Sequence, residues 1–317
     1  MFSSNFLSAM ALAAFAVSGV QAETDENGNF VPGPIAVIHG MNSSCPMEFW
    51  TQAIEKAIDY KAVVKCIEFG DGITDSLFFR MDWQAAKICQ KLMNDPDFAG
   101  KEISLVGMSQ GGIAARAIVE RCDGLKVHTL MTYGAPHAGN SVPLNGIRTI
   151  TQYWKEKCNK WYCPFIDHML RYFLEFTLAW DWGAPQEYCR PWWSADRYYE
   201  HSAFLPTLNN ELAEKNELYK ERLSNVKYFG MWRWVEDYVV VPRDSSWFFS
   251  WDEERKPIPL KDLQMYEEDW VGLRTLYESN RLFFYTGKGD HMHLEQWMMD
   301  EYLAPMLLEQ TPVPSEY

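Results

Sequence analysis

The stretch Ile103-Ser104-Leu105-Val106-Gly107-Met108-Ser109-Gln110-Gly111-Gly112 carries the most information about the fold. Its first four residues form an apolar run typical of a buried strand, and residues 107–112 form a sharp turn. Residues 113–121 then have the apolar spacing of an amphipathic helix. A Gly-x-Ser-x-Gly turn between a strand and a helix is a nucleophile elbow, in which a strained serine projects its hydroxyl group. We therefore expect Ser109 to be a nucleophile.

Predicted strands and predicted helices alternate along the chain on either side of this turn. The expected strands are apolar runs bounded by turn residues, at residues 34–38, 62–67, 103–106, 127–133, 226–231 and 282–285. The expected helices have apolar residues at helical spacing, at residues 48–60, 82–93, 113–121 and 293–308. Such alternation predicts a mostly parallel central sheet with helices on both faces, and the elbow makes it an α/β-hydrolase fold.

The segment from about residue 138 to 225 interrupts this alternation. It is rich in Trp and Phe, and its pattern indicates several helices with no strands between them. We expect it to be a mainly helical cap inserted into the sheet. Residues 23–317 would then form a single domain that contains this insertion.

The first 22 residues differ from the rest of the chain. Residues 6–20 are a run of small apolar residues, and Val20-Gln21-Ala22 offers a small-x-small cleavage site, which together predict a signal peptide. The run is too short to span a bilayer, and we expect no transmembrane segment elsewhere. The net charge of -14 argues against a nucleic-acid partner, which would need a basic patch. The sequence thus predicts a protein of the secretory pathway, lysosomal or secreted.

A serine hydroxyl becomes a nucleophile only with the help of a histidine base and an acid that orients the histidine. In this fold the acid follows the serine in the sequence, and the histidine follows the acid. The loop after the last expected strand contains His291, so we favour His291 as the base over its neighbour His293. The acid belongs in the loop after the preceding strand. There Asp237 is the favoured residue, with Glu236 and Asp244 as alternatives.

The negative oxygen that forms during acyl transfer needs two backbone N–H donors. One should come from the residue after the nucleophile, Gln110. The other should come from the loop after the first strand, where Met41 follows His39-Gly40. Because these donors are backbone groups, the identity of the side chain matters less.

Seven cysteines are available in a compartment that favours disulfides: Cys45, Cys66, Cys89, Cys122, Cys158, Cys163 and Cys189. An odd number leaves at least one thiol without an intrachain partner. No group of His and Cys has the spacing of zinc ligands, and we expect neither a metal nor a cofactor.

The chain resembles the palmitoyl-protein thioesterases over nearly the whole sequence after the leader. The motifs that carry the resemblance are His39-Gly40-Met41, Gly107-Met108-Ser109-Gln110-Gly111-Gly112, Glu120-Arg121-Cys122, His201-Ser202-Ala203-Phe204-Leu205, Asp244-Ser245-Ser246-Trp247-Phe248 and Gly289-Asp290-His291. The resemblance implies that Ser109, Asp237 and His291 are catalytic and that Met41 and Gln110 supply the oxyanion hole. It also implies removal of palmitoyl groups from S-acylated proteins in the lysosome or outside the cell.

The resemblance further implies two disulfides, Cys89–Cys122 and Cys158–Cys163. The chain departs from the family at Ser44-Cys45, where two adjacent cysteines are typical, so Cys45 has either Cys66 or Cys189 as its partner. The family's acyl-binding groove falls on the aromatic cap, where the candidate residues are Trp154, Trp161, Phe165, Phe173, Phe176 and Trp180. Such a groove would gain about 0.8 kcal/mol for each buried CH₂ group of the acyl chain.

Two other functions are compatible with the same motifs. A secreted lipase or carboxylesterase would use the same three residues, because esters and thioesters pass through the same tetrahedral intermediate. A non-catalytic protein of the same fold would bind partners through the aromatic cap. The resemblance favours the thioesterase, whose partners would be S-palmitoylated proteins or peptides and long-chain acyl thioesters, with transient contact with lipid.

Overall fold

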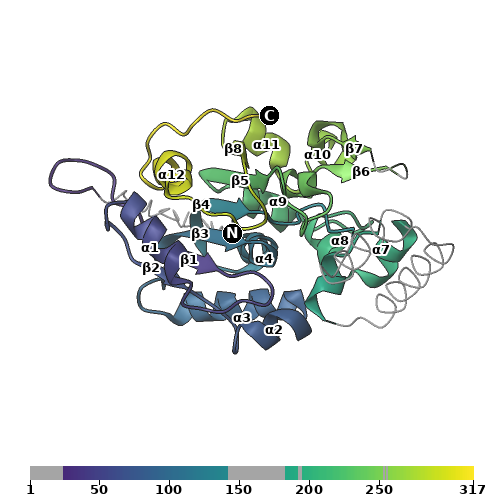
Figure 1. Ribbon diagram of the computed structural model, residues 1–317, viewed down its shortest axis with the longest axis horizontal. Helices are drawn as coiled ribbons and strands as arrows, with labels where there is room; N and C mark the ends of the chain where they lie inside the picture. The colour runs from purple at the N-terminus through teal and green to yellow at the C-terminus, as the bar shows by residue number, and fades with distance from the viewer. Residues whose placement is uncertain (1–23, 142–182, 192–194, 253, 255) are drawn as a thin grey trace, which may run out of the picture.

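The computed structural model describes residues 24–141, 183–191, 195–252, 254 and 256–317 (Figure 1). The expected signal peptide lies outside these residues. The strands of the main sheet are β1 (Ile35–Ile38), β2 (Val64–Cys66), β3 (Glu102–Met108), β4 (Lys126–Tyr133), β5 (Tyr228–Trp234) and β8 (Leu282–Gly287). The α-helices are α1 (Glu48–Ala57), α2 (Ile73–Phe78), α3 (Met81–Asn94), α4 (Gln110–Arg121), α7 (Ala195–His201), α8 (Phe204–Leu208), α9 (Glu217–Ser224), α10 (Gln264–Glu267), α11 (Leu273–Glu278), α12 (Gln296–Met298) and α13 (Ala304–Leu307).

The six strands form one parallel sheet in the order β2-β1-β3-β4-β5-β8. The elbow strand β3 lies between β1 and β4, in the interior of the sheet. In a parallel sheet the carboxyl ends of all strands meet at one edge, which is where ligands bind in open α/β folds. The predicted α/β-hydrolase architecture with a parallel central sheet is confirmed.

Side chains alternate between the two faces of the sheet, because neighbouring residues of a strand point in opposite directions. In β1, Ala36 and Ile38 pack into a core with α3, α4, α9 and α11. Ile35 and Val37 point the other way and pack with α1, α12 and α13. Both faces are therefore covered by helices, and this explains why the strands are apolar throughout rather than alternating with polar residues.

The C-terminal helix differs from the expected continuous helix at residues 293–308. It begins at Gln296 and consists of α12, a π-helical turn at Met299–Leu303 and α13. Pro305 lies in the first turn of α13 and has no backbone N–H to donate to the residue four positions earlier. The chain therefore changes its hydrogen-bond spacing just before this proline.

Short elements that the sequence patterns did not reveal complete the fold. They are the helix α2, a hairpin of β6 (Ser250–Trp251) and β7 (Pro257–Ile258), the helices α10 and α11, and 3₁₀ turns η1 (Ala184–Tyr188), η2 (Arg243–Trp247) and η3 (Leu260–Asp262). Each of these elements has six residues or fewer, which is too short for a period to be recognised.

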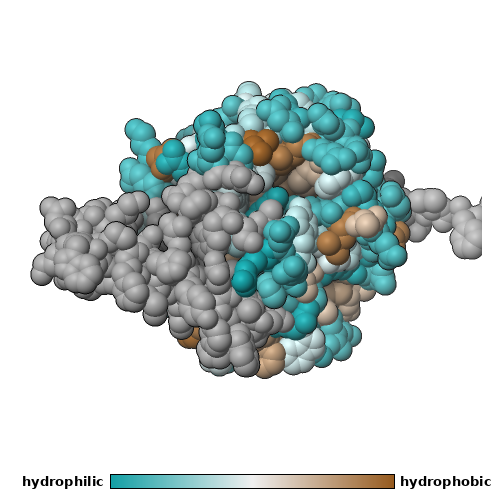
Figure 2. Space-filling model, turned by 90° about the vertical axis from the view of Figure 1, so that its right-hand side faces the viewer, coloured by the Kyte–Doolittle hydropathy of each residue, from teal (hydrophilic) through white to brown (hydrophobic). Residues whose placement is uncertain are grey.

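The described residues between β4 and β5 contain η1, α7, α8 and α9 and no strand of the main sheet. At the end of the molecule near α7 and α8, Figure 2 shows hydrophilic residues over most of the described surface, with hydrophobic ones in separate groups. No helix among the described residues is long and apolar enough to cross a membrane.

Two disulfides join described residues. Cys89 of α3 is bonded to Cys122 at the end of α4, as the resemblance implied, and Cys45 is bonded to Cys66 at the end of β2. Cys66 and Cys189 were both candidate partners of Cys45. The structure has the Cys45–Cys66 disulfide, and Cys189 is a buried free thiol. The expected pair Cys158–Cys163 lies outside the described residues.

An ion pair is buried within the elbow helix α4. Arg116 and Glu120 are fully buried, with Arg116 Nη1 3.7 Å from Glu120 Oε1. Arg116 also donates a hydrogen bond of 2.6 Å to Asn209 Oδ1, and its guanidinium lies 4.8 Å from the ring centre of Phe248. Burial disfavours the carboxylate and raises the pKa of Glu120 from 4.5 to about 7, although the charge of Arg116 opposes this.

Because of this pKa shift, Glu120 contributes more to the stability of the folded protein at acidic pH than at neutral pH. Between pH 4.5 and 7 the native state binds more protons at Glu120 than the unfolded chain does, so stability falls as pH rises through this range. We expect a loss on the order of 3 kcal/mol between pH 4 and pH 8 that is absent in Glu120→Gln. Urea unfolding at several pH values measures it. The exposed Glu221→Gln on α9 is the control, and equal pH profiles for both variants would contradict the prediction.

Candidate active site

Ser109 lies at the junction between β3 and α4 in a conformation that few non-glycine residues adopt. Its backbone angles are φ 52° and ψ −126°, and its N–H donates to the carbonyl of Tyr133 at 2.7 Å. Such strain persists only where the surrounding structure enforces it. Gly111 is part of that structure, since a Cβ there would lie 2.3 Å from the carbonyl oxygens of both Ile38 and His39. Only glycine therefore fits at this position of the turn.

His291 and Asp237 lie beside Ser109 in a continuous hydrogen-bonded chain. His291 Nε2 is 2.9 Å from Ser109 Oγ, and His291 Nδ1 is 2.7 Å from Asp237 Oδ2. The three residues come from the carboxyl ends of three different strands, β3, β5 and β8. Because a carboxylate can only accept, Nδ1 carries the proton facing Asp237 and Nε2 is left to accept the proton of Ser109.

The carboxylate of Asp237 is itself held in place. Its side chain is almost completely buried, and Oδ1 accepts the backbone N–H groups of Val239 at 2.8 Å and Val240 at 2.9 Å. The ring of Trp234 meets that of His291 edge to face, at 6.1 Å between ring centres. Asp237 thus keeps one oxygen for the backbone and one for the histidine, which fixes the orientation of the imidazole ring.

The three alternatives considered for the acid and the base lie elsewhere. His293 Nε2 is 3.0 Å from Glu295 Oε1, and its side chain is half exposed. Glu236 is exposed to solvent. Asp244 forms an ion pair with Arg233. Within the described residues, the hydrogen-bonded arrangement around Ser109 therefore contains Asp237 and His291.

The loop after β1 reaches the nucleophile. A Cβ on Gly40 would lie 2.9 Å from the Cβ of Ser109, so only glycine permits this approach. His39 Nδ1 is 2.8 Å from the Gly40 carbonyl oxygen, and His39 Nε2 is 3.6 Å from Glu68 Oε2. Met41 follows Gly40 directly, and Gln110 begins helix α4, whose N-terminal end carries partial positive charge. The two residues expected to supply the oxyanion hole therefore lie next in sequence to Gly40 and to Ser109, which approach each other closely at the elbow.

The six aromatic residues expected to bind an acyl chain, Trp154 to Trp180, lie outside the described residues. No group of three or more His, Cys, Asp or Glu side chains with the geometry of a metal site occurs in the described part of the chain. Several residues around the elbow carried no recognisable signal in the sequence, namely Ser76, Tyr188 and Glu68. Each is a common polar residue that reaches the site only through the tertiary fold.

A parallel sheet with a strained serine after a central strand, bonded to a histidine and a buried aspartate, defines an α/β hydrolase. The family model for palmitoyl protein thioesterase matches residues 34–291. Palmitoyl-protein thioesterase 3 of Dictyostelium discoideum is 32% identical over 264 residues, which cover 81% of this chain and 84% of that protein. The chain belongs to the palmitoyl protein thioesterase family, and it is a thioester hydrolase.

Two further relatives are more distant. Palmitoyl-protein thioesterase 1 of Caenorhabditis elegans is 26% identical, over 82% of this chain and 87% of that protein. Lysosomal thioesterase PPT2-B of Xenopus laevis is 24% identical, over 81% of this chain and 85% of that protein. The similarity therefore extends through most of each relative and is not limited to the elbow.

Proposed function

We propose that this protein removes long-chain fatty acyl groups, palmitoyl above all, from S-acylated cysteines of proteins or peptides. The observation that carries the proposal is the chain of two hydrogen bonds from Ser109 through His291 to Asp237. The names of its relatives supply the substrate class, since two of them are called palmitoyl-protein thioesterases.

The geometry suits a two-stage reaction. Ser109 Oγ attacks the thioester carbonyl carbon while its proton passes to His291 Nε2, and the carbonyl oxygen becomes an oxyanion. The C–S bond then breaks, and His291 gives its proton to the departing cysteine sulfur. In the second stage His291 takes a proton from water, which attacks the acyl-serine ester. The fatty acid leaves, and the proton returns to Ser109 Oγ.

The oxyanion would be bound by the backbone N–H groups of Met41 and Gln110. The contact between Gly40 and Ser109, and the position of Gln110 at the start of α4, support this assignment. The acyl chain would bind in the insertion at about residues 138–225, whose aromatic residues provide apolar surface. Adjacent, parallel pairing of β4 and β5 supports a single domain at residues 23–317, because the sheet continues directly across this insertion.

The compartment would be the lysosome or the extracellular space. The two disulfides support an oxidising route through the secretory pathway. The Xenopus laevis relative is named a lysosomal thioesterase. An acidic compartment also suits Glu120, because burial raises its pKa to about 7 and its carboxyl group would be neutral there.

The substrate is tested with a matched pair of acyl donors. We expect the protein to hydrolyse palmitoyl-CoA and a palmitoylated cysteine peptide with a higher kcat/KM than the same peptide carrying palmitoyl on serine. The two peptides differ only in sulfur or oxygen at the scissile bond, so the comparison isolates the leaving atom.

Each result has a distinct meaning for the two other functions. Preferential hydrolysis of the serine ester would favour a lipase or carboxylesterase with the same three residues. A folded sample that cleaves neither peptide and does not react with a fluorophosphonate would favour a non-catalytic binding protein.

A further inference from the structure

The loop that follows β1 is anchored at two points away from the nucleophile. Near its start, the backbone N–H of Asn42 donates to Ser76 Oγ at 2.9 Å. Further on, the backbone N–H of Cys45 donates to Glu68 Oε2 at 2.7 Å, and the Cys45–Cys66 disulfide ties the same residue to β2. The first anchor is the one adjacent to Met41, so Ser76 controls the part of the loop nearest to Ser109.

Ser76 is also bonded to the elbow. Its backbone carbonyl accepts from Gln110 Nε2 at 2.7 Å, and Gln110 Oε1 accepts from the hydroxyl of Tyr188 at 3.0 Å. Its own hydroxyl proton goes to the carbonyl of Ile73, at 2.9 Å, which leaves the lone pairs of Oγ for Asn42. One residue of α2 thus links the loop after β1 to the residue that follows the nucleophile.

We propose that Ser76 is a positioning residue that sets the distance between the two N–H donors of the oxyanion hole. The proposal rests on the proposed function, because it takes the backbone N–H groups of Met41 and Gln110 as these donors. Among the described residues, the hydrogen bonds of Ser76 go to Asn42, Ile73 and Gln110 and not to Ser109. Ser76 acts through Asn42 on one side and through the Gln110 side chain on the other.

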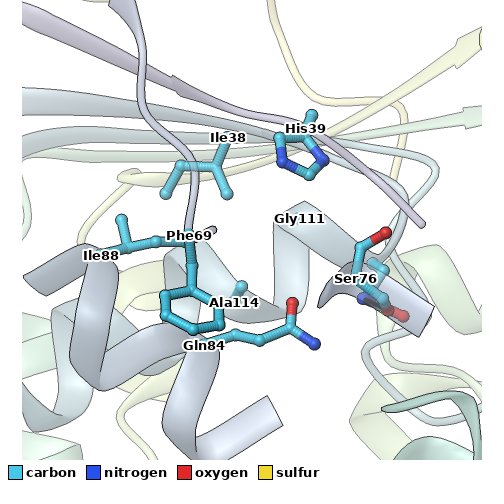
Figure 3. Close-up of a pocket in the computed structure, with 9 residues that line it drawn as sticks. Ile38, His39, Phe69, Ser76, Gln84, Ile88, Gly111 and Ala114 are labelled. Atoms are coloured by element: carbon cyan, nitrogen blue, oxygen red, sulfur yellow. Dashed lines mark hydrogen bonds between the residues drawn. The ribbon is translucent and has the colours of Figure 1, made fainter. Parts of the chain in front are cut away.

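The packing beside Ser76 is incomplete. A cavity of about 10 Å³, roughly enough for one water molecule, separates α2 and α3 from the start of α4. Figure 3 shows Ser76 and Gln84 at its border, together with His39 and Gly111. Without the Ser76 hydroxyl, the backbone N–H of Asn42 loses its acceptor.

The test compares three substitutions on α2. Ser76→Ala removes the acceptor of Asn42 and is expected to lower kcat roughly tenfold to a hundredfold, with KM changed less than about twofold. Ser76→Thr keeps the hydroxyl and should restore most of the activity. Thr74→Ala removes an exposed hydroxyl of the same helix and is the matched control.

Two readouts separate positioning from a general loss of structure. Affinity for a palmitoyl trifluoromethyl ketone, whose adduct with Ser109 carries an oxyanion, should fall in parallel with kcat/KM, while affinity for palmitate stays constant. The thermal transition of Ser76→Ala should show a folded protein. An unchanged kcat in Ser76→Ala, or a rise in KM alone, would overturn the proposal.

A double-substitution cycle tests whether Gln110 belongs to the same network. Gln110→Met keeps the backbone N–H and removes both side-chain hydrogen bonds. If both residues act through one network, Ser76→Ala combined with Gln110→Met should lose little more activity than the more damaging single variant. Losses that multiply would contradict a shared network.

The rate at which a fluorophosphonate labels Ser109 tests the positioning role of Ser76 without any assumption about the substrate. If the wild type cleaves no thioester but is labelled, and Ser76→Ala is labelled more slowly, the proposed substrate fails and the positioning inference stands. If thioester is cleaved and labelling of Ser76→Ala is as fast as that of the wild type, the inference fails and the proposed function stands.

Discussion

Ser109→Ala is expected to lower kcat for thioester hydrolysis by roughly a million-fold, with a small residual rate from the oxyanion hole and substrate binding. The reason is that, among the residues that the structure describes, the hydroxyl of Ser109 is the one bonded to His291. Without it no acyl-enzyme forms, and the imidazole has no proton to accept. The measurement is turnover of palmitoyl-CoA together with labelling by a fluorophosphonate, which should be lost completely.

The control for this substitution is Ser104→Ala, in the same strand β3. Ser104 is also buried, but it lies five residues before the nucleophile. Its removal should leave turnover and labelling near the wild-type level. Persistent labelling of Ser109→Ala, with the probe mapped to another serine, would show that the nucleophile is misassigned.

Asp237→Asn is expected to lower kcat by about ten thousand-fold while the fold is retained. The backbone N–H groups of Val239 and Val240 would still select the amide oxygen, so the NH₂ group would face His291. A donor at that position can bond only to an unprotonated Nδ1. The imidazole would then carry its proton on Nε2, where it cannot accept the proton of Ser109.

Glu236→Gln is the matched control, because it makes the same chemical change one residue away on an exposed side chain. Turnover of this variant should equal that of the wild type. Equal losses in both variants would point to a diffuse electrostatic effect. Near-normal turnover of Asp237→Asn would mean that another group orients the histidine.

The local pattern around Ser109 was sufficient to predict the fold and to single out Ser109 as the candidate nucleophile. An apolar run, a glycine-rich turn and a helical repeat follow one another within 19 residues, from Ile103 to Arg121, and the structure has β3, the elbow and α4 there. The chain order of acid and histidine then limited their positions to two loops. These inferences worked because side-chain periodicity and turn chemistry depend on consecutive residues.

The choice among neighbouring residues depended on contacts between distant segments. Ser109 and His291 are 182 positions apart in the sequence. The place of His291 in the loop after the last strand favoured it over His293, and the resemblance supported the same choice. Helix α2 is another example, since Ile73–Phe78 is short and combines β-branched, Asp and Ser residues of modest helix propensity. Its position follows from hydrogen bonds to Asn42 and Gln110, which no local pattern encodes.

The sequence by itself thus determined the sheet, the elbow and the order in which the reacting groups follow each other, because each is encoded in a short run of residues. The tertiary structure alone decided which cysteine bonds to Cys45 and which residue of α2 meets the loop after β1. The physical reason is that short-range periodicity selects secondary structure. The partner of a polar group, by contrast, depends on which loops the folded chain brings within about 3 Å.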